Sequence, residues 1–127
     1  MLNEEKFVGK CLDSFLQQTK GRKDVEILCM DGMSTDRTGE IVRQFGERDS
    51  RIRLIENPHK IVSAAMNLGI AQSRGDFILI AGCHAEYAPD YVDKCQEVLE
   101  RTGADKVGGY LTTAPSEDTP TGRAIAA

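Results

Sequence analysis

The sequence lacks a membrane-spanning apolar run, a basic cluster and a signal-peptide pattern. Its longest apolar run, Phe77 to Cys83, is far shorter than the roughly 20 residues that a membrane-spanning helix needs. The formal net charge is -4 and the Lys and Arg residues are scattered along the chain, so no nucleic-acid partner is predicted. The first residues also lack the basic and apolar blocks of a secretory signal.

Paired cysteine spacings are absent as well. The four cysteines, Cys11, Cys29, Cys83 and Cys95, lie far apart, and none of their spacings fits a zinc or redox motif. Three of them, all except Cys83, fall on apolar faces, which predicts small, reduced core residues without disulfides. With 40% hydrophobic residues, the 127-residue chain is predicted to form one globular, cytoplasmic domain.

Helical and strand patterns alternate along the chain. Helices are predicted after the capping residues Asn3 and Asp36, from Ile61 to near Gly75 with a buried stripe of Ile61, Ala64, Ala65 and Leu68, and from Pro89 onward. Strands are predicted over residues 25–30, 52–55, 77–81 and 107–111, of which 77–81 is the clearest. This alternation indicates an α/β fold with a mostly parallel sheet and helices on both faces.

The alternation begins with a helix rather than a strand. In an open α/β sheet the first strand is usually interior, and its neighbours lack hydrogen-bond partners without it. We therefore expect Met1 to be an internal methionine or a truncation point, and the sheet to be incomplete.

Ligands of such sheets bind beyond the carboxyl ends of the strands, where residues 2–5, 30–36 and 82–86 are expected to meet. Asp31 ends a predicted strand in a loop of small residues, where its carboxylate is able to accept hydrogen bonds from a base or ribose. A turn-forming role explains Asp31 equally well.

Two further residues are candidates for binding charged groups. His84, with Glu86 two residues later, follows the clearest strand and suits a divalent metal or a phosphate, although a lone loop histidine usually binds neither. Lys60 precedes the third predicted helix, whose N-terminus would help it to bind a phosphate. A solvated lysine is the more common outcome.

The ordered series of short motifs resembles glycosyltransferase family 2. The series comprises residues 3–5 (NEE), 11–19 (CLDSFLQQT), 26–27 (EI), 31–38 (DGMSTDRT), 55–58 (IENP), 65–71 (AMNLGIA) and 74–78 (RGDFI). Residues 84–91 (HAEYAPDY) resemble the succinoglycan-biosynthesis branch in particular. The resemblance covers nearly the whole chain.

The resemblance implies a Rossmann-like nucleotide-sugar-binding fold of the GT-A type, with residues 1–127 as a partial domain of a glycosyltransferase. It implies transfer of a sugar, with inversion, from a UDP-sugar to a glycan or lipid-linked acceptor in polysaccharide biosynthesis. By similarity, Asn3 and Glu4 line the nucleotide pocket, Asp31 holds the uracil or ribose, and Lys60 faces the nucleotide. Relatives of this branch often act at the cytoplasmic face of the membrane, so membrane association is expected only through segments outside this sequence.

The chain departs from the family pattern in two places. The metal motif aligns with Gly82-Cys83-His84, so its leading carboxylate is absent. Either Mg²⁺ or Mn²⁺ is held mainly by the donor diphosphate and His84, or this copy has lost efficient catalysis. The general base of the family lies beyond Ala127, and Glu117 and Asp118 fall in a loop that does not suggest that role. We expect this fragment alone to be inactive.

Two alternatives remain at this stage. The first is a catalytically degenerate nucleotide-binding module, which the glycine at position 82 favours. The second is a phosphoacceptor signalling domain, because Glu4, Glu5 and Asp31 imitate an acidic phosphorylation pocket. That pocket also needs a hydroxyl residue and a lysine after later strands, where this chain has Ala81-Gly82 and Leu111-Thr112.

Overall fold

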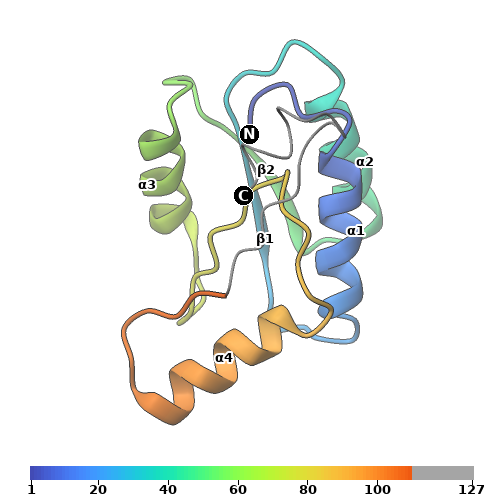
Figure 1. Cartoon of the computed structure of the whole chain (residues 1–127). Helices are drawn as coiled ribbons and strands as arrows, with labels where there is room; N and C mark the ends of the chain where they lie inside the picture. The colour runs from blue at the N-terminus through green and yellow to red at the C-terminus, as the bar shows by residue number, and fades with distance from the viewer. Residues whose placement is uncertain (110–127) are drawn as a thin grey trace, which may run out of the picture.

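Two parallel strands with helices on both faces form the described part of the chain, which is residues 1–109 of the computed structural model (Figure 1). The elements in order are α1 (Val8–Gln18), β1 (Ile27–Asp31), α2 (Thr38–Arg48), β2 (Ile52–Glu56), α3 (Val62–Gln72) and α4 (Tyr91–Thr102). Figure 1 shows α1 and α2 on one side of the strand pair, α3 on the other, and α4 across the lower end. The α/β class and the parallel pairing are therefore confirmed.

The strands pair in register from Ile27 opposite Ile52 to Asp31 opposite Glu56. The core lies between this pair and the helices α1 and α2, where Val8, Leu12, Cys29, Val42 and Ile52 are buried. Val8 and Leu12 share one helical face because they are four residues apart. Full burial of such side chains contributes about 1.5–3 kcal/mol each, so this cluster fixes the strands against the two helices.

The prediction for the cysteines holds only in part. All four lie within the described residues and are free of disulfides. Cys29 is buried in the core, whereas Cys11 and Cys95 are only half-buried.

The predicted cap at Asn3 is wrong, whereas Asp36 does support the start of a helix. Helix α1 begins at Val8, and Asn3 lies before it with a left-handed backbone (φ 55°). Asp36 accepts a hydrogen bond from the backbone amide of Thr38, the first residue of α2, at 3.0 Å. The first amides of a helix have no partner within the helix, and the Asp36 carboxylate satisfies one of them.

The strand predicted at residues 77–81 is not formed. Phe77, Ile78, Leu79 and Ile80 are 40–60% exposed, and within residues 1–109 the sheet contains only β1 and β2. An apolar run becomes a strand only when a neighbour supplies ladder hydrogen bonds, and no described strand takes that place. Next to β1, Met1 supplies two hydrogen bonds of this kind. Its amino group donates to the Met30 carbonyl, and its carbonyl accepts from Gly32 N–H, both at 2.8 Å.

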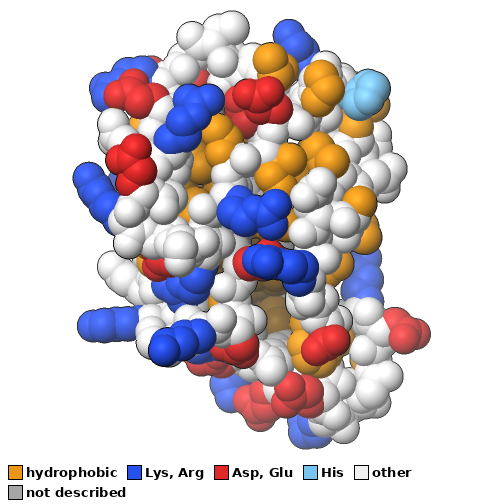
Figure 2. Space-filling view, turned by 180° about the vertical axis from the view of Figure 1, so that it is seen from behind, with side chains coloured by type: hydrophobic (Ala, Val, Ile, Leu, Met, Phe, Trp, Pro, Cys, Tyr) orange, Lys and Arg blue, Asp and Glu red, His pale blue; other side chains and the backbone are white. Residues whose placement is uncertain are grey.

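Two other sequence predictions need revision. Residues 107–109 are not in a strand, and the remainder of the predicted strand at 107–111 lies outside the described residues. Helix α3 has no fully buried residue: Ile61 is 58% exposed, while Ala64, Ala65 and Leu68 are half-buried. The reason is that α3 packs on one strand only, with Gly69 next to the Met30 side chain. Figure 2 shows hydrophobic side chains at the surface among charged ones.

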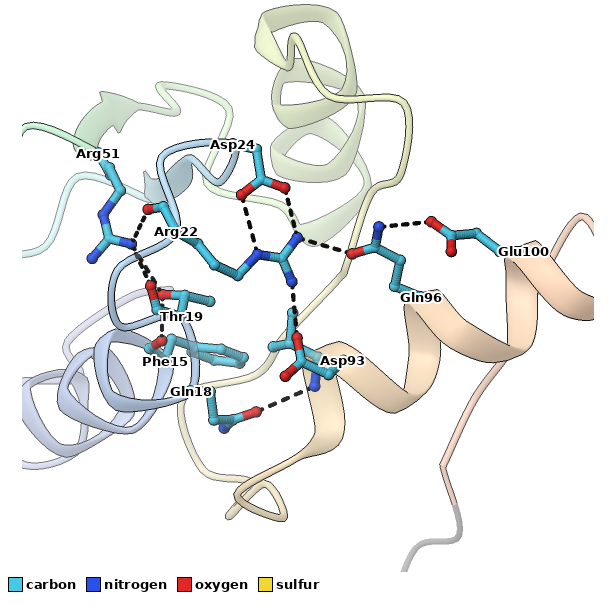
Figure 3. Close-up of polar contacts among 10 residues, drawn as sticks. Phe15, Gln18, Thr19, Arg22, Asp24, Arg51, Asp93, Gln96 and Glu100 are labelled. Carbon is cyan, nitrogen blue, oxygen red and sulfur yellow. Dashed lines mark hydrogen bonds and ion pairs between the residues drawn. The ribbon is translucent and has the colours of Figure 1, made fainter.

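A polar network ties the lower end of the molecule together (Figure 3). The Arg22 guanidinium donates to Asp93 and to Gln96 of α4, each at 2.9 Å, and also pairs with Asp24. Arg51 donates to the carbonyls of Thr19 and Arg22 at 2.8 and 2.9 Å, just after α1. These contacts hold α4 and the end of α1 at the amino ends of the strands.

None of the helices within residues 1–109 is long and apolar enough to cross a membrane.

Candidate functional site

The loops that follow β1 and β2 meet at the carboxyl ends of the strands. Asp31 and Glu56 end the two strands opposite each other, and Asn57 N–H continues the pairing with a hydrogen bond to the Asp31 carbonyl at 2.6 Å. The loop after β1 then leads into α2, and the loop after β2 leads through Lys60 into α3. This edge therefore gathers side chains from separate elements.

A hollow of about 670 Å³ opens at this edge. Its walls come from the end of β1 with the loop that follows, from α2, and from the end of β2 with its loop, and they include Asp31, Ser34, Thr35, Asp36, Arg37, Arg43, Glu56 and Lys60. Sites for small ligands commonly enclose about 300–1,000 Å³, so a nucleotide is of suitable size. A second hollow of about 520 Å³ runs along α4 and is lined by residues of that helix alone, so it gathers no groups from other elements.

The Asp31 carboxylate lies in the wall of the hollow and is engaged by Ser34. Its two oxygens accept hydrogen bonds from the Ser34 amide at 3.1 Å and from the Ser34 hydroxyl. Only 7% of Asp31 is exposed. The turn-forming role is thus present in the structure, while the same side chain also borders the hollow.

Asn3 supports the wall of the hollow from outside and is not part of its lining. The Asn3 side-chain oxygen accepts a hydrogen bond from Thr35 N–H at 2.9 Å, and Asn3 N–H donates to the Ser34 hydroxyl at 2.9 Å. Glu4 adds a contact with the start of α2, because Glu4 N–H donates to the Thr38 hydroxyl at 2.7 Å. The segment at residues 3–5 therefore holds the loop after β1 in place.

The electrostatics of this loop favour an ionised Asp36. Burial alone would raise the pKa of Asp36, but hydrogen bonds from the Thr38 hydroxyl and amide and from Glu5 N–H outweigh it and hold the pKa below its ordinary value. Glu5 in turn accepts a hydrogen bond from Arg37 N–H at 3.1 Å. Both carboxylates are thus used to order the loop.

The hollow also carries cationic side chains. Arg37 pairs with Glu40 at 3.2 Å, whereas Lys60 and Arg43 form no ion pair with any of the described residues. Lys60 has a left-handed backbone (φ 59°), which costs a residue with a side chain about 1–2 kcal/mol. This conformation places Lys60 in the wall of the same hollow as Asp31.

His84 and Glu4 form a separate pair beside this loop. The His84 Nε2 atom lies 2.9 Å from Glu4 Oε2 and 3.0 Å from Oε1, although the residues are 80 positions apart. The His84 ring also packs on Phe7 with a centroid distance of 4.4 Å. The Glu4 side chain is 15% exposed, so it is largely enclosed, whereas His84 is 65% exposed.

The neighbouring Cys83 fixes the same loop to α1. A hydrogen bond with the Cys11 thiol lowers the pKa of Cys83 to about 7 and raises that of Cys11, which burial raises further. Burial raises the pKa of Cys29 to about 12. Cys83 also packs against the core cluster.

The sequence of the chain matches a known protein family. Residues 1–126 match Glycosyl transferase family 2. The chain belongs to this family.

Several curated glycosyltransferases are similar to this chain. Glycosyltransferase GlyA of Streptococcus pneumoniae is 35% identical over 91% of the chain, and a glycosyltransferase named EpsJ of Bacillus subtilis is 41% identical over 85%. The succinoglycan biosynthesis protein ExoA of Rhizobium meliloti is 32% identical over 84%. The matched regions make up 16%, 31% and 32% of those three proteins, so the chain spans about a third of their length or less.

Family membership bears on the fold class and on one of the two alternatives. As a member of glycosyl transferase family 2 with parallel strands and flanking helices, the chain is consistent with a partial Rossmann-like fold of the GT-A type. Its sequence is of the glycosyl transferase family 2 type, and one relative is named as a succinoglycan biosynthesis protein. Nothing in these matches supports the phosphoacceptor alternative.

The structure brings some of the predicted site residues together and leaves others apart. Asp31 and Lys60 line one hollow, whereas Asn3 lies outside it and Glu4 and His84 pair with each other. Arg43 was missed, although it lies on α2 one turn after Gly39, the small residue that borders the hollow. The pairing of Glu4 with His84 has no signal in local sequence, because it depends on how the first loop and the loop after residue 81 come together.

Proposed function

We propose that this chain is the donor-binding part of an inverting glycosyltransferase, which transfers a sugar from a UDP-sugar to a glycan or lipid-linked acceptor. The observation that carries the proposal is the hollow at the carboxyl ends of the strands, where acids and cations from separate elements face one space and where Lys60 and Arg43 pair with no acid of residues 1–109. Ligands of open α/β sheets bind at this edge. Family membership supplies the reaction class.

The side chains of the hollow suit the two halves of a nucleoside diphosphate. Asp31 at the end of β1 is assigned to the ribose or base, since a carboxylate accepts hydrogen bonds from hydroxyl and ring N–H groups. Lys60 and Arg43 are assigned to the diphosphate, whose negative charge they offset. Lys60 also stands just before α3, and a helix N-terminus favours a phosphate.

A divalent cation would complete the charge balance on the leaving diphosphate. The residues present fit such a cation only through His84, whose Nε2 atom is paired with the Glu4 carboxylate at 2.9 Å, and no group of three His, Cys, Asp or Glu residues lies together within residues 1–109. Mg²⁺ commonly uses only one or two protein ligands and takes the rest from water and phosphate oxygens. When bound, the cation would act as a Lewis acid on the diphosphate.

The acceptor side of the reaction is proposed from the relatives. A relative from Methanococcus voltae, 33% identical over 86% of the chain, has a name that describes transfer to a dolichyl-linked sugar phosphate. We place the reaction of this chain at the cytoplasmic face of a membrane, with a glycan or lipid-linked acceptor. The general base belongs to the acceptor half, and none of residues 1–109 is assigned that role.

Isothermal titration with UDP and GDP tests the binding part of the proposal. We expect UDP to bind more tightly than GDP, and we expect Lys60→Gly to weaken binding of UDP much more than that of uridine. Lys94→Ala is the control, because Lys94 is an exposed lysine of α4 paired with Glu97. Absence of UDP binding to the parent chain would refute the proposal.

A second candidate is a nucleotide-binding module without efficient transfer, which the glycine at position 82 favours. A Cβ atom added at Gly82 meets none of the described residues within 4 Å, so the backbone leaves room for a side chain there. Mn²⁺-dependent turnover of UDP-sugars should be compared between the parent and Gly82→Asp, each in a protein that also carries the acceptor half. Turnover by the parent supports the transferase, whereas turnover by Gly82→Asp alone supports the degenerate module.

A further inference from the structure

We infer that Cys11 and Cys83 are a site of reversible disulfide formation, by which oxidation fixes the loop of residues 82–87 to helix α1. The inference goes beyond the proposed function, because it concerns a covalent modification of the chain and not the binding of a donor. Both residues are free cysteines, and the Cys11 thiol donates a hydrogen bond to the Cys83 sulfur. The fold thus brings together two thiols that are far apart in the sequence.

Aromatic contacts on both sides of Cys11 hold the loop along one face of α1. Residues spaced by four share a helical face, and three such residues lie here: Phe7, Cys11 and Phe15. The ring of Phe7 packs on His84 with centroids 4.4 Å apart, and the ring of Phe15 packs on Tyr87 at 4.9 Å. Cys83 lies on the loop between these contacts, so its sulfur is kept beside that of Cys11 by packing on either side.

The loop has room for the small approach that a disulfide needs. A disulfide joins sulfur atoms about 2 Å apart, so the two thiols have to move closer than hydrogen-bond contact. Cys11 lies within α1, whereas Cys83 lies outside the helices and strands. A Cβ atom added at the preceding Gly82 meets none of the described residues within 4 Å. We therefore assign the movement to the loop and not to the helix.

The other two cysteines are less suited to the same reaction. Cys29 is 8% exposed and belongs to the core cluster, so an oxidant in solution reaches its sulfur only when the core opens. Cys95 is half-buried but lies on α4, at the amino ends of the strands. Cys11 and Cys83 are both half-buried and in contact, which combines access for an oxidant with a partner thiol.

The oxidant that we propose is a low-molecular-weight disulfide such as oxidised glutathione. One thiol of the pair loses its proton and attacks a glutathione sulfur, which forms a mixed disulfide and releases one glutathione thiolate. The second thiol then loses its proton and attacks the protein sulfur of the mixed disulfide. This step forms the bond between Cys11 and Cys83 and releases the second glutathione thiolate. The two protons end on the two glutathione molecules, so two protein thiols are oxidised and one disulfide is reduced.

Tryptic mapping of the oxidised chain tests the pairing. Each cysteine falls in a separate tryptic peptide, because a Lys or Arg residue lies between every two of them. The native chain is treated with oxidised glutathione, the remaining thiols are blocked with iodoacetamide, and linked peptides are identified by mass spectrometry. We expect residues 11–20 to be joined to residues 75–94, and dithiothreitol to separate them. The same treatment in denaturing urea should give mixed pairings, because the fold no longer selects the partner.

Two variants identify the partner thiol. Cys11→Ala removes the thiol that resolves the mixed disulfide, so Cys83 should retain a glutathione adduct that the parent does not accumulate. Cys95→Ala is the matched control, because Cys95 is also a half-buried cysteine of a helix, and it should give the same linked peptides as the parent. If Cys11→Ala does not fold, the peptide map of the parent decides the question alone.

Urea denaturation measures the effect of the bond on the fold. The linkage closes a loop of more than half of the chain, so the oxidised parent should unfold at a higher urea concentration than the reduced parent. Linkage of Cys29 to Cys83, or glutathione adducts without an internal linkage, would overturn the inference. An unchanged or lower urea midpoint after complete linkage would do so as well. The proposed function does not depend on either result, since no cysteine is among the described residues that line the hollow.

Discussion

The Asp31 carboxylate accepts hydrogen bonds from both the amide and the hydroxyl of Ser34. One side chain thus forms the turn that follows β1 and borders the hollow at the end of the strands. The two interpretations of Asp31, as a turn residue and as a ligand-binding residue, are therefore compatible. Substitutions of Asp31 and of Ser34 separate the contribution of the turn from that of the carboxylate to UDP binding.

Asp31→Asn keeps the size of the side chain and removes its charge. We expect UDP affinity to fall about tenfold, which corresponds to about 1.4 kcal/mol, because the amide is a weaker acceptor for ribose hydroxyls. Ser34→Ala keeps the carboxylate and should lower affinity less than Asp31→Asn does. Titration calorimetry measures both, and equal UDP affinity of Asp31→Asn and the parent would contradict the assignment of Asp31.

Lys60 combines a left-handed backbone with a cationic side chain. Lys60→Gly should raise the free energy of unfolding or leave it unchanged, because glycine adopts this conformation without strain, while UDP affinity falls. Lys60→Arg should retain the affinity. Chemical denaturation and UDP titration are measured on the same samples, and a Lys60→Gly variant that binds UDP like the parent would show that Lys60 does not face the diphosphate.

The sequence predicted the elements whose partners are close in the chain. Strands β1 and β2 are joined by α2, and their apolar residues pack on one another and on α1, so local patterns suffice to identify them. The run at residues 77–81 has the strongest strand pattern of the chain but is exposed and unpaired within the described residues. Local pattern measures the tendency to form a strand, whereas the strand itself requires a neighbour.

The candidate site was predictable only in part for the same reason. Asp31 and Lys60 follow strand patterns directly, and strand ends define the edge where ligands bind. Arg43 lies on the polar side of an amphipathic helix pattern. Such a pattern does not distinguish a solvated arginine from one that borders a hollow. The contact of Glu4 with His84 joins residues 80 positions apart, and no local pattern encodes it.

Asp49 and Arg51 link stability to pH. Hydrogen bonds from the Arg51 side chain and amide lower the pKa of Asp49 to about 2. A lowered pKa stabilises the fold above the ordinary pKa of aspartate, and this stability is lost as the pH falls from about 4 towards 2. The pair is partly exposed, so after screening we expect Asp49→Asn to cost about 1 kcal/mol at pH 7.

Urea denaturation at pH 7 and at pH 2.5 measures this effect. The difference between Asp49→Asn and the parent should shrink at the lower pH, because the Asp49 carboxylate is then largely protonated in the unfolded state and partly so in the folded state. Asp105→Asn, at an exposed position, is the control. A difference of the same size at both pH values would contradict the role of the Asp49 charge.

Cys83 should be the most reactive thiol of the chain near neutral pH. Its pKa of about 7 reflects the hydrogen bond with Cys11, whereas burial holds the pKa of Cys29 near 12. We expect iodoacetamide to modify Cys83 with a rate that rises through pH 7, and Cys11→Ala to move this midpoint upward. Mass spectrometry of the alkylated chain gives the rate at each cysteine, and a Cys83 midpoint near 9 would contradict the effect.

The central claim is that a uridine nucleotide binds in the hollow at the carboxyl ends of β1 and β2. Titration of the ¹⁵N-labelled chain with UDP, followed by amide chemical shifts, tests this most directly. The account predicts the largest shifts at Asp31, Ser34 and Lys60, with little change along α4. Shifts that are largest on α4, or no shifts at millimolar UDP, would contradict it.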